Sequence, residues 1–215
     1  MESQGYDFTE AVRYLLDMYC RDADVHDLFE KNTPEDDEQR RLMETMYIYN
    51  KYAYEFYRAQ YDDTGDESVM CRNYAEEHIT SNGAKEGRWN AEYCKTIGLG
   101  YSPRTGNKFL AYAQSKGLKL DILLKMGLIG ESDTRPGEYY DFYRGRLMIP
   151  QRDRYGRIVT FTARAISGQA SSKYLNGKDC LIYSKSKSIF GIDVALKAAR
   201  QTGKIYLVEG APDVM

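Results

Sequence analysis

The hydrophobic periodicity of this chain changes once, near residue 130, and that change restricts the folds it can adopt. Before it, one long segment carries apolar residues at helical spacing, in the stripe Leu42, Met46, Tyr49, Ala53 and Phe56. This segment has Thr33 as helix N-cap and Pro34 at the first helical position, and it should end near Tyr61. After residue 130, segments 146–150 and 157–164 alternate or run apolar like strands, around a turn at 153–156. Helices followed by a sheet predict the α+β class.

Shorter elements follow from the same signals. Helices are expected near the N-terminus, from Asp7 with its capping box, and at 69–79, 90–95, 108–116, 120–126 and 193–201. Residues 97–103 contain too much glycine and proline for a helix interior and predict an extended crossing. Two further strands are expected, at 180–183 and, as a buried strand, at 204–208.

Composition excludes several classes of protein. Hydrophobic residues make up 42% of the 215 positions, but apolar runs are only a few residues long and the mean hydropathy is −0.63, so no membrane partner is expected. Four scattered cysteines without Cys-x-x-Cys spacing, and no leader sequence, predict reduced thiols, a cytoplasmic location and no zinc site within the chain. The lone His26 and His78 receive no role.

Charge is divided unevenly along the chain, although the formal net charge is only −2. Residues 1–134 hold 16 Lys and Arg against 25 Asp and Glu, whereas residues 135–204 hold 14 against 5. A compact basic segment favours a polyanion partner, and nucleic acid is the usual one. The alternative is that the acidic and basic parts attract each other within the fold, and the acidic half could then mask the basic face.

Arginines dominate the polar positions of the predicted sheet. Arg144 and Arg146 are two residues apart, so on a strand they would share a face, and Arg164 follows in the second strand. A face rich in guanidinium groups needs phosphates or carboxylates opposite it. These cations are expected to converge on one groove.

Lysines continue the basic segment after the hairpin, with Tyr174 beside them, at Lys173, Lys178, Lys185 and Lys187. Cations next to an aromatic ring are typical of a groove that follows a phosphate backbone and stacks a base. Taken alone, solvated surface lysines explain the pattern better.

The last predicted strand, 204–208, leads directly into the string EGAPD. Strand ends of this kind gather ligand and metal sites, and Glu209 and Asp213 are carboxylates that could bind Mg²⁺ or move a proton. Glu-Gly-x-x-Asp alone is a weak signal, because many strand-to-helix turns carry acids. The groove of cations should lead to Glu209.

Taken together, these strings resemble the RNA-polymerase core of bacterial-type DNA primases, the enzymes that synthesise RNA primers on single-stranded DNA. The matching strings occur in the family's order: IGLGYSP at 97–103, KMGLI at 125–129, YDFYRGRLMIPQRDRYGRIVTFTAR, KYLN at 173–176, IYSKSKSIFGI and VEGAPD. The segment GYDFTEAVRYLLDM, at 5–18, is similar to the one that closes the zinc-ribbon domain of those primases.

This resemblance implies a domain organisation. Residues 1–30 would be the helical tail of a zinc-ribbon domain that is missing here. Residues 31–200 would form the N-terminal subdomain of the RNA-polymerase core, helical over 31–134 and basic and strand-rich over 135–200. Residues 201–215 would begin a toprim domain, an α/β module that binds Mg²⁺, with its first strand.

The resemblance also implies the site residues. Glu209 matches the catalytic toprim glutamate, and Asp213 matches a second metal-ligating acid. The residues implied to contact template or nucleotide are Arg144, Arg146, Arg164, Lys173, Tyr174, Asn176 and Lys185. Mg²⁺ or Mn²⁺ would be the cofactor of the complete toprim site, with zinc only in the upstream domain.

The implied partners are a single-stranded DNA template and ribonucleoside triphosphates, with a replicative helicase as a further partner. Because the chain stops before the remaining toprim aspartates, it is expected to bind single-stranded DNA weakly and to synthesise no primer alone. The string QASS at 169–172 lacks the family's usual proline, so the local path is expected to differ. Two alternatives are a toprim nuclease or topoisomerase-like enzyme, and a non-catalytic single-stranded DNA-binding module of a mobile element.

Overall fold

The computed structural model describes residues 33–79, 89–167 and 172–215. The chain divides into two units, Met1–Arg41 and Leu42–Met215, and the second unit contains both hydrophobic cores. The helical tail predicted at 1–30 lies outside the described residues. None of the helices in the described ranges is long and apolar enough to cross a membrane.

The helices predicted within the described residues are present. The long helix α2 (Pro34–Asp62) begins where the capping signals place it, because the Asp36 amide donates to Thr33 Oγ1 at 3.2 Å and the Thr33 amide donates back to the Asp36 carboxylate at 2.8 Å. The shorter helices are α3 (Asp66–Ile79), α4 (Ala91–Ile97), α5 (Lys108–Ser115), α6 (Leu120–Met126), α7 (Ile192–Thr202) and α8 (Ala211–Val214).

The main sheet has four antiparallel strands in the order β1-β4-β5-β6. The predicted hairpin forms its centre as β4 (Arg146–Arg152) and β5 (Ile158–Ala165), and the predicted extended crossing supplies β1 (Gly100–Ser102). The edge strand β6 (Tyr174–Asn176) lies in a segment for which the sequence pattern predicts no strand. A separate ribbon pairs β2 (Ile129–Glu131) with β3 (Tyr139–Asp141). This mixture of helices and sheet confirms the α+β class.

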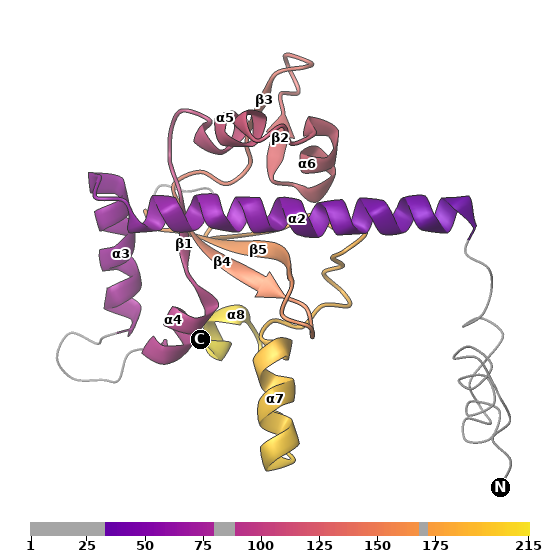
Figure 1. The fold of residues 1–215 in the computed structure, drawn as a ribbon. Coiled ribbons are helices and arrows are strands. Elements are labelled where there is room, and N and C mark those ends of the chain that lie inside the picture. Colours follow the sequence, from indigo (N-terminus) through magenta and orange to yellow (C-terminus); the bar gives the residue numbers. More distant parts are fainter. Residues whose placement is uncertain (1–32, 80–88, 168–171) are drawn as a thin grey trace, which may run out of the picture. The chain divides into compact units, whose positions relative to one another are not determined.

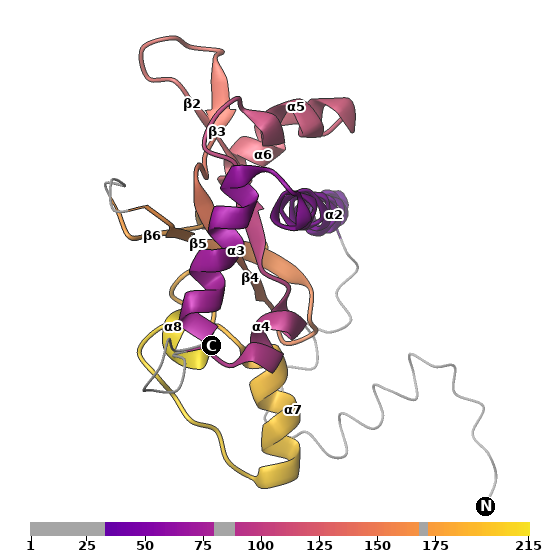
Figure 2. The same ribbon diagram turned by 90° about the vertical axis from the view of Figure 1, so that its left-hand side faces the viewer.

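Each face of the main sheet covers a different core. One face packs Met148 and Phe161 against α2, α5 and α6, in a core that includes Phe109 and Leu123. The other face packs Leu147 and its neighbours against α3 and α4. Figures 1 and 2 show α5, α6 and the β2–β3 ribbon gathered at one end of this unit and α7 at the other.

The buried carboxylate of Asp141 fixes the start of α5. Its two oxygens accept the backbone N–H groups of Phe109 at 3.0 Å and Leu110 at 2.8 Å, which no intrahelical carbonyl can pair. Asp141 is 2% exposed, and desolvation raises its pKa while these two hydrogen bonds and Arg144 oppose the rise. The cap therefore comes from β3, more than thirty residues along the chain.

Two predicted strands are wrong. Residues 204–208 are irregular, and Ile205, Tyr206, Leu207 and Val208 are all exposed. A buried strand needs hydrogen-bonded neighbours on its edges, and no strand among the described residues pairs with this segment, so the expected first toprim strand is not formed. At 180–183 the chain instead makes a tight turn, in which Cys180 and Tyr183 exchange backbone hydrogen bonds.

Candidate nucleic-acid interface

A polar stripe crosses one face of the main sheet, beside the apolar contacts of Leu147. Residues paired across antiparallel strands share a face, and the register pairs Gln151 with Thr160 and Thr162 with Asn176. Thr162 Oγ1 donates to Asn176 Oδ1 at 3.0 Å. On this part of the sheet face, the side chains carry hydroxyl and amide groups, whereas those around Leu147 are apolar.

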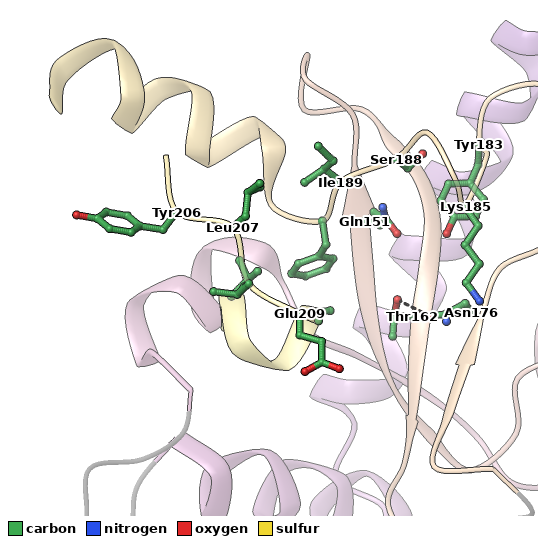
Figure 3. Close-up of a pocket in the computed structure, with 15 residues that line it drawn as sticks. Gln151, Thr162, Asn176, Tyr183, Lys185, Ser188, Ile189, Tyr206, Leu207 and Glu209 are labelled. Carbon is green, nitrogen blue, oxygen red and sulfur yellow. Dashed lines mark hydrogen bonds between the residues drawn. The ribbon is translucent and has the colours of Figure 1, made fainter. Parts of the chain in front are cut away.

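Three residues of the polar stripe, Gln151, Thr162 and Asn176, form one wall of a cavity of about 460 Å³. The segments 183–190 and 206–214 complete the lining, and they bring Lys185 and Glu209 to the same cavity as Asn176. Figure 3 shows Lys185 extending beside Asn176, and Glu209 on the segment across the cavity. Both charged side chains are exposed, so an ion or nucleotide can reach them from solvent.

The position of Glu209 depends on how α8 is anchored. The Asn90 amide, at the start of α4, donates to the Met215 carbonyl, and the Met215 side chain is buried in the core beside α3 and α4. Gly191 lies against α8 with φ +76°, and a Cβ at this position would lie 2.9 Å from Val214. Because no side chain stands at Gly191, α8 packs closely enough to hold Glu209 at the cavity.

The two carboxylates of this turn do not make a metal centre by themselves. One Asp213 oxygen accepts the Gly210 amide at 3.0 Å, so that carboxylate caps the turn. Within the described ranges, no group of three His, Cys, Asp or Glu side chains is placed to hold a metal ion. The donor set of the described residues therefore does not fit the two-ion chemistry of nucleotidyl transfer.

Arg164 and Tyr174 are cross-strand partners, and each is two residues from a member of the polar stripe, Thr162 or Asn176, so both lie on the same face of the sheet as the stripe. Arg164 is only 6% exposed, and it donates to the hydroxyl groups of Tyr74 and Tyr174. Burial is the largest cause that raises the pKa of Tyr174. The negative charge of Asp213 raises this pKa further. Lys173, at the start of this edge, is exposed.

Arg144 and Arg146 do not share a face as predicted. β4 begins at Arg146, so the alternation of strand side chains does not extend to Arg144, which is exposed and donates to Asn107 Oδ1 at 2.6 Å. Arg146 is 6% exposed and pairs with Ala165, so it points to the opposite face from Arg164. Burial lowers the pKa of its guanidinium. The arginines therefore do not converge on one groove.

Sequence reasoning missed the residues around Arg164. Tyr74 and His78 are four residues apart on α3, so they lie on one face of that helix, and the tilted ring of Trp89 contacts His78 with a ring-centroid distance of 4.7 Å. The four-residue spacing of Tyr74 and His78 was the only sequence signal for this cluster. Its connection to Arg164 needs the tertiary packing of α3 against the sheet.

Comparison with known proteins identifies the relatives of this chain. A family model described as the N-terminal domain of the DNA primase catalytic core matches residues 74–196. A DNA primase of Staphylococcus aureus (strain COL) is 33% identical over 121 residues, which are 56% of this chain and 20% of that protein. A DNA primase of Streptomyces coelicolor is 36% identical over 155 residues, which are 68% and 24% of the two chains. The matches thus span no more than about a quarter of these relatives.

A solved structure has a similar fold. The RNA polymerase domain of Mycobacterium tuberculosis primase, in complex with a double-stranded DNA oligomer with a 6-nucleotide overhang, aligns with a TM-score of 0.61 and 25% identity, over 74% of this chain and 46% of that chain. The arrangement of helices and antiparallel sheet agrees with this likeness. Because the family model covers more than half of its residues, the chain belongs to the family of the DNA primase catalytic core and matches its N-terminal domain.

Proposed function

We propose that this chain supplies the template- and nucleotide-binding part of a DNA primase, an enzyme that synthesises RNA primers on single-stranded DNA. One observation carries the proposal: a single cavity, on a polar face of the sheet, is lined by Asn176, Lys185 and Glu209. The first two of these residues lie inside the segment that matches the primase family. The DNA complex of the Mycobacterium tuberculosis relative supports a nucleic-acid ligand.

The chemistry of the cavity suits a nucleotide. Its volume of about 460 Å³ lies within the usual range for small-molecule sites. The Lys185 ammonium group is a mobile point charge suited to phosphate, whereas the amide of Asn176 can hydrogen-bond a base or sugar. We assign Lys173 to the template backbone, because it is exposed at the adjoining end of β6.

We assign different roles to the two arginines near the start of β4, Arg144 and Arg146. Arg144 is exposed, and we assign it a separate phosphate contact at the edge of the interface. Arg146 is buried on the opposite face of the sheet, where its guanidinium donates to the Ala163 carbonyl at 3.4 Å, so we assign it no ligand. The proposed interface is therefore smaller than the sequence implied.

In this proposal, the chain binds template and nucleotide, and catalysis requires a complete toprim site. Residues 31–200 form the N-terminal subdomain, and 201–215 begin the toprim domain with Glu209 as its catalytic carboxylate and Asp213 as a second acid. The resemblance to primases is what implies Mg²⁺ or Mn²⁺ as cofactor and a replicative helicase as partner, and we assign no described residue to the helicase. The chain alone should synthesise no primer from template, ribonucleotides and Mg²⁺, and primer formation would refute this division.

Binding of a fluorescent single-stranded oligothymidylate, measured by anisotropy at several salt concentrations, tests the proposal. Lys185→Ala should weaken binding about fivefold, the effect of about 1 kcal/mol for one solvated charge pair. It should also reduce the slope of log affinity against log salt by about 0.7, the value for one contact to a single strand.

Lys125→Ala is the matched control, because Lys125 is an exposed lysine on α6 and does not line the cavity. Its affinity and salt slope should equal those of the unmodified chain. Equal losses for the two variants would show that binding depends on total charge, and no binding at low salt would refute the proposed interface.

One observation favours a second candidate, the non-catalytic DNA-binding module. Among the described residues that line the cavity, Glu209 is the only carboxylate, and the nearby Asp213 caps a turn. Such a module predicts the same binding results and no primer in any longer form of the protein. The family match over 74–196 disfavours the nuclease or topoisomerase alternative.

A further inference from the structure

The guanidinium group of Arg164 is enclosed by aromatic rings from three segments of the chain. Its Cζ atom lies 5.5 Å from the ring centroid of Tyr74, 5.4 Å from that of Trp89 and 5.2 Å from that of Tyr174. Tyr74 belongs to α3 and Tyr174 to β6, whereas Trp89 immediately precedes Asn90, the N-cap residue of α4. The arrangement differs from a surface cation–π pair, because it surrounds the cation on several sides.

Hydrogen bonds fix the orientation of the same group. Nε donates to the Tyr74 hydroxyl and Nη1 to the Tyr174 hydroxyl, while Nη2 lies 3.0 Å from His78 Nε2. His78 Nδ1 lies 2.8 Å from the Tyr74 carbonyl oxygen, which can only accept, so Nδ1 carries the proton. The lone pair of Nε2 therefore accepts from Arg164.

This enclosure leaves little of Arg164 for a ligand. Each of its three nitrogens already donates to a protein acceptor, and the residue is 6% exposed. A phosphate would have to displace two tyrosine hydroxyls or a histidine to form the two parallel hydrogen bonds that arginine makes best. By contrast, the side chains of Lys173 and Lys185 are exposed to solvent.

Arg164 connects β6 to α3. It reaches Tyr74 and His78 on α3 and Tyr174 on β6 with one planar group. β6 is a three-residue edge strand, and its ladder holds it from one side only. Tyr174 lies directly between Lys173 and Leu175, with Asn176 following, so fixing its side chain fixes the direction of the residues beside it.

We propose that Arg164 is a positioning residue, which holds β6 through Tyr174 and thereby places Lys173 and Asn176 for nucleic acid, and that it does not itself contact phosphate. The inference rests on the proposed function for the identity of the ligand. Its structural part, the fixing of β6 by Arg164, is measurable without any ligand.

Arg164→Lys separates the two roles because it retains the charge. An ammonium group cannot serve three acceptors arranged around a plane, or stack on aromatic faces as guanidinium does. A positioning role therefore predicts that Arg164→Lys weakens binding of the oligothymidylate as much as Arg164→Met does, by about fivefold for one misplaced charge contact. A phosphate contact predicts that Arg164→Lys stays close to the unmodified chain.

A double-mutant cycle shows whether the effect passes through β6. In a Lys173→Ala background, Arg164→Lys should have little further effect on affinity, because the contact that it misplaces is already gone. General destabilisation would weaken binding equally in both backgrounds. Tyr174→Phe should weaken binding like Arg164→Lys, whereas Tyr74→Phe, which removes a hydroxyl acceptor on the α3 side, is the matched control and should have a smaller effect.

Hydrogen exchange measures the positioning without DNA. Arg164→Lys and Tyr174→Phe should speed amide exchange in 172–177 and leave α5 and α6 unchanged. Unchanged exchange in 172–177 would overturn the proposal, as would an Arg164→Lys variant that binds normally. Faster exchange together with no DNA binding by the unmodified chain would uphold the positioning and refute the proposed function.

Discussion

The carboxylate of Asp141 offers a sharp test of how β3 and α5 are joined. Asp141→Ala leaves the backbone N–H groups of Phe109 and Leu110 without their acceptors. An unpaired buried donor costs about 1–3 kcal/mol, and the Leu110 amide is only partly shielded from water, so we expect a loss of about 2–4 kcal/mol in the free energy of unfolding. Equilibrium urea denaturation measures this loss directly.

The pH dependence of the same residue has a definite sign. Desolvation raises the pKa of Asp141 above its ordinary value of 3.8, so the folded chain holds this proton more tightly than the unfolded chain does. The stability contributed by Asp141 should therefore fall as pH rises from about 3.8 through the raised pKa. The difference in unfolding free energy between the unmodified chain and Asp141→Asn isolates this effect from the other carboxylates.

Asp121→Ala is the control, because Asp121 is an exposed acid in the first turn of α6 and caps no distant element. It should change stability by no more than about 0.5 kcal/mol. A similar small effect for Asp141→Ala, or an advantage over Asp141→Asn that grows as pH rises, would refute the assigned cap and its electrostatics.

Two further predictions concern packing and thiol chemistry. A Cβ at Gly177 would lie 1.7 Å from Thr160 Oγ1, so Gly177→Ala should lower stability by about 1–3 kcal/mol, and an unchanged melting temperature would contradict this close approach. Burial raises the pKa of Cys71 to about 12 and that of Cys94 to about 11, so iodoacetamide at neutral pH should spare both thiols in the folded chain and modify the partly exposed Cys180, as read by peptide mass spectrometry.

Elements with strong local signals were predictable from the sequence. α2 has its Thr33 cap and its apolar stripe, and the β4–β5 hairpin has alternating strands around a polar turn. β6 and the β2–β3 ribbon were missed because strands of three residues are defined by their partners more than by their own pattern. Residues 204–208 show the converse, since a strand-like pattern forms no strand where no neighbour is available.

The candidate site was predictable in part. Order and spacing of the family strings identified Asn176, Lys185 and Glu209, which line one cavity. The environments of the arginines were not accessible, because a shift of one residue in register decides which face a strand side chain occupies. Arg146 thus lies on the far face, and Arg164 is enclosed by rings that come from distant segments.

Photo-crosslinking of a 4-thiothymidine oligonucleotide to the unmodified chain tests the proposed DNA-binding face most directly. Adducts mapped by mass spectrometry should fall in 172–190 and 204–215, the segments that surround the cavity with Lys185 and Glu209. Adducts confined to the exposed ring of Tyr155 at the tip of the β4–β5 hairpin, or to α2, would place the nucleic acid elsewhere and contradict the proposed interface.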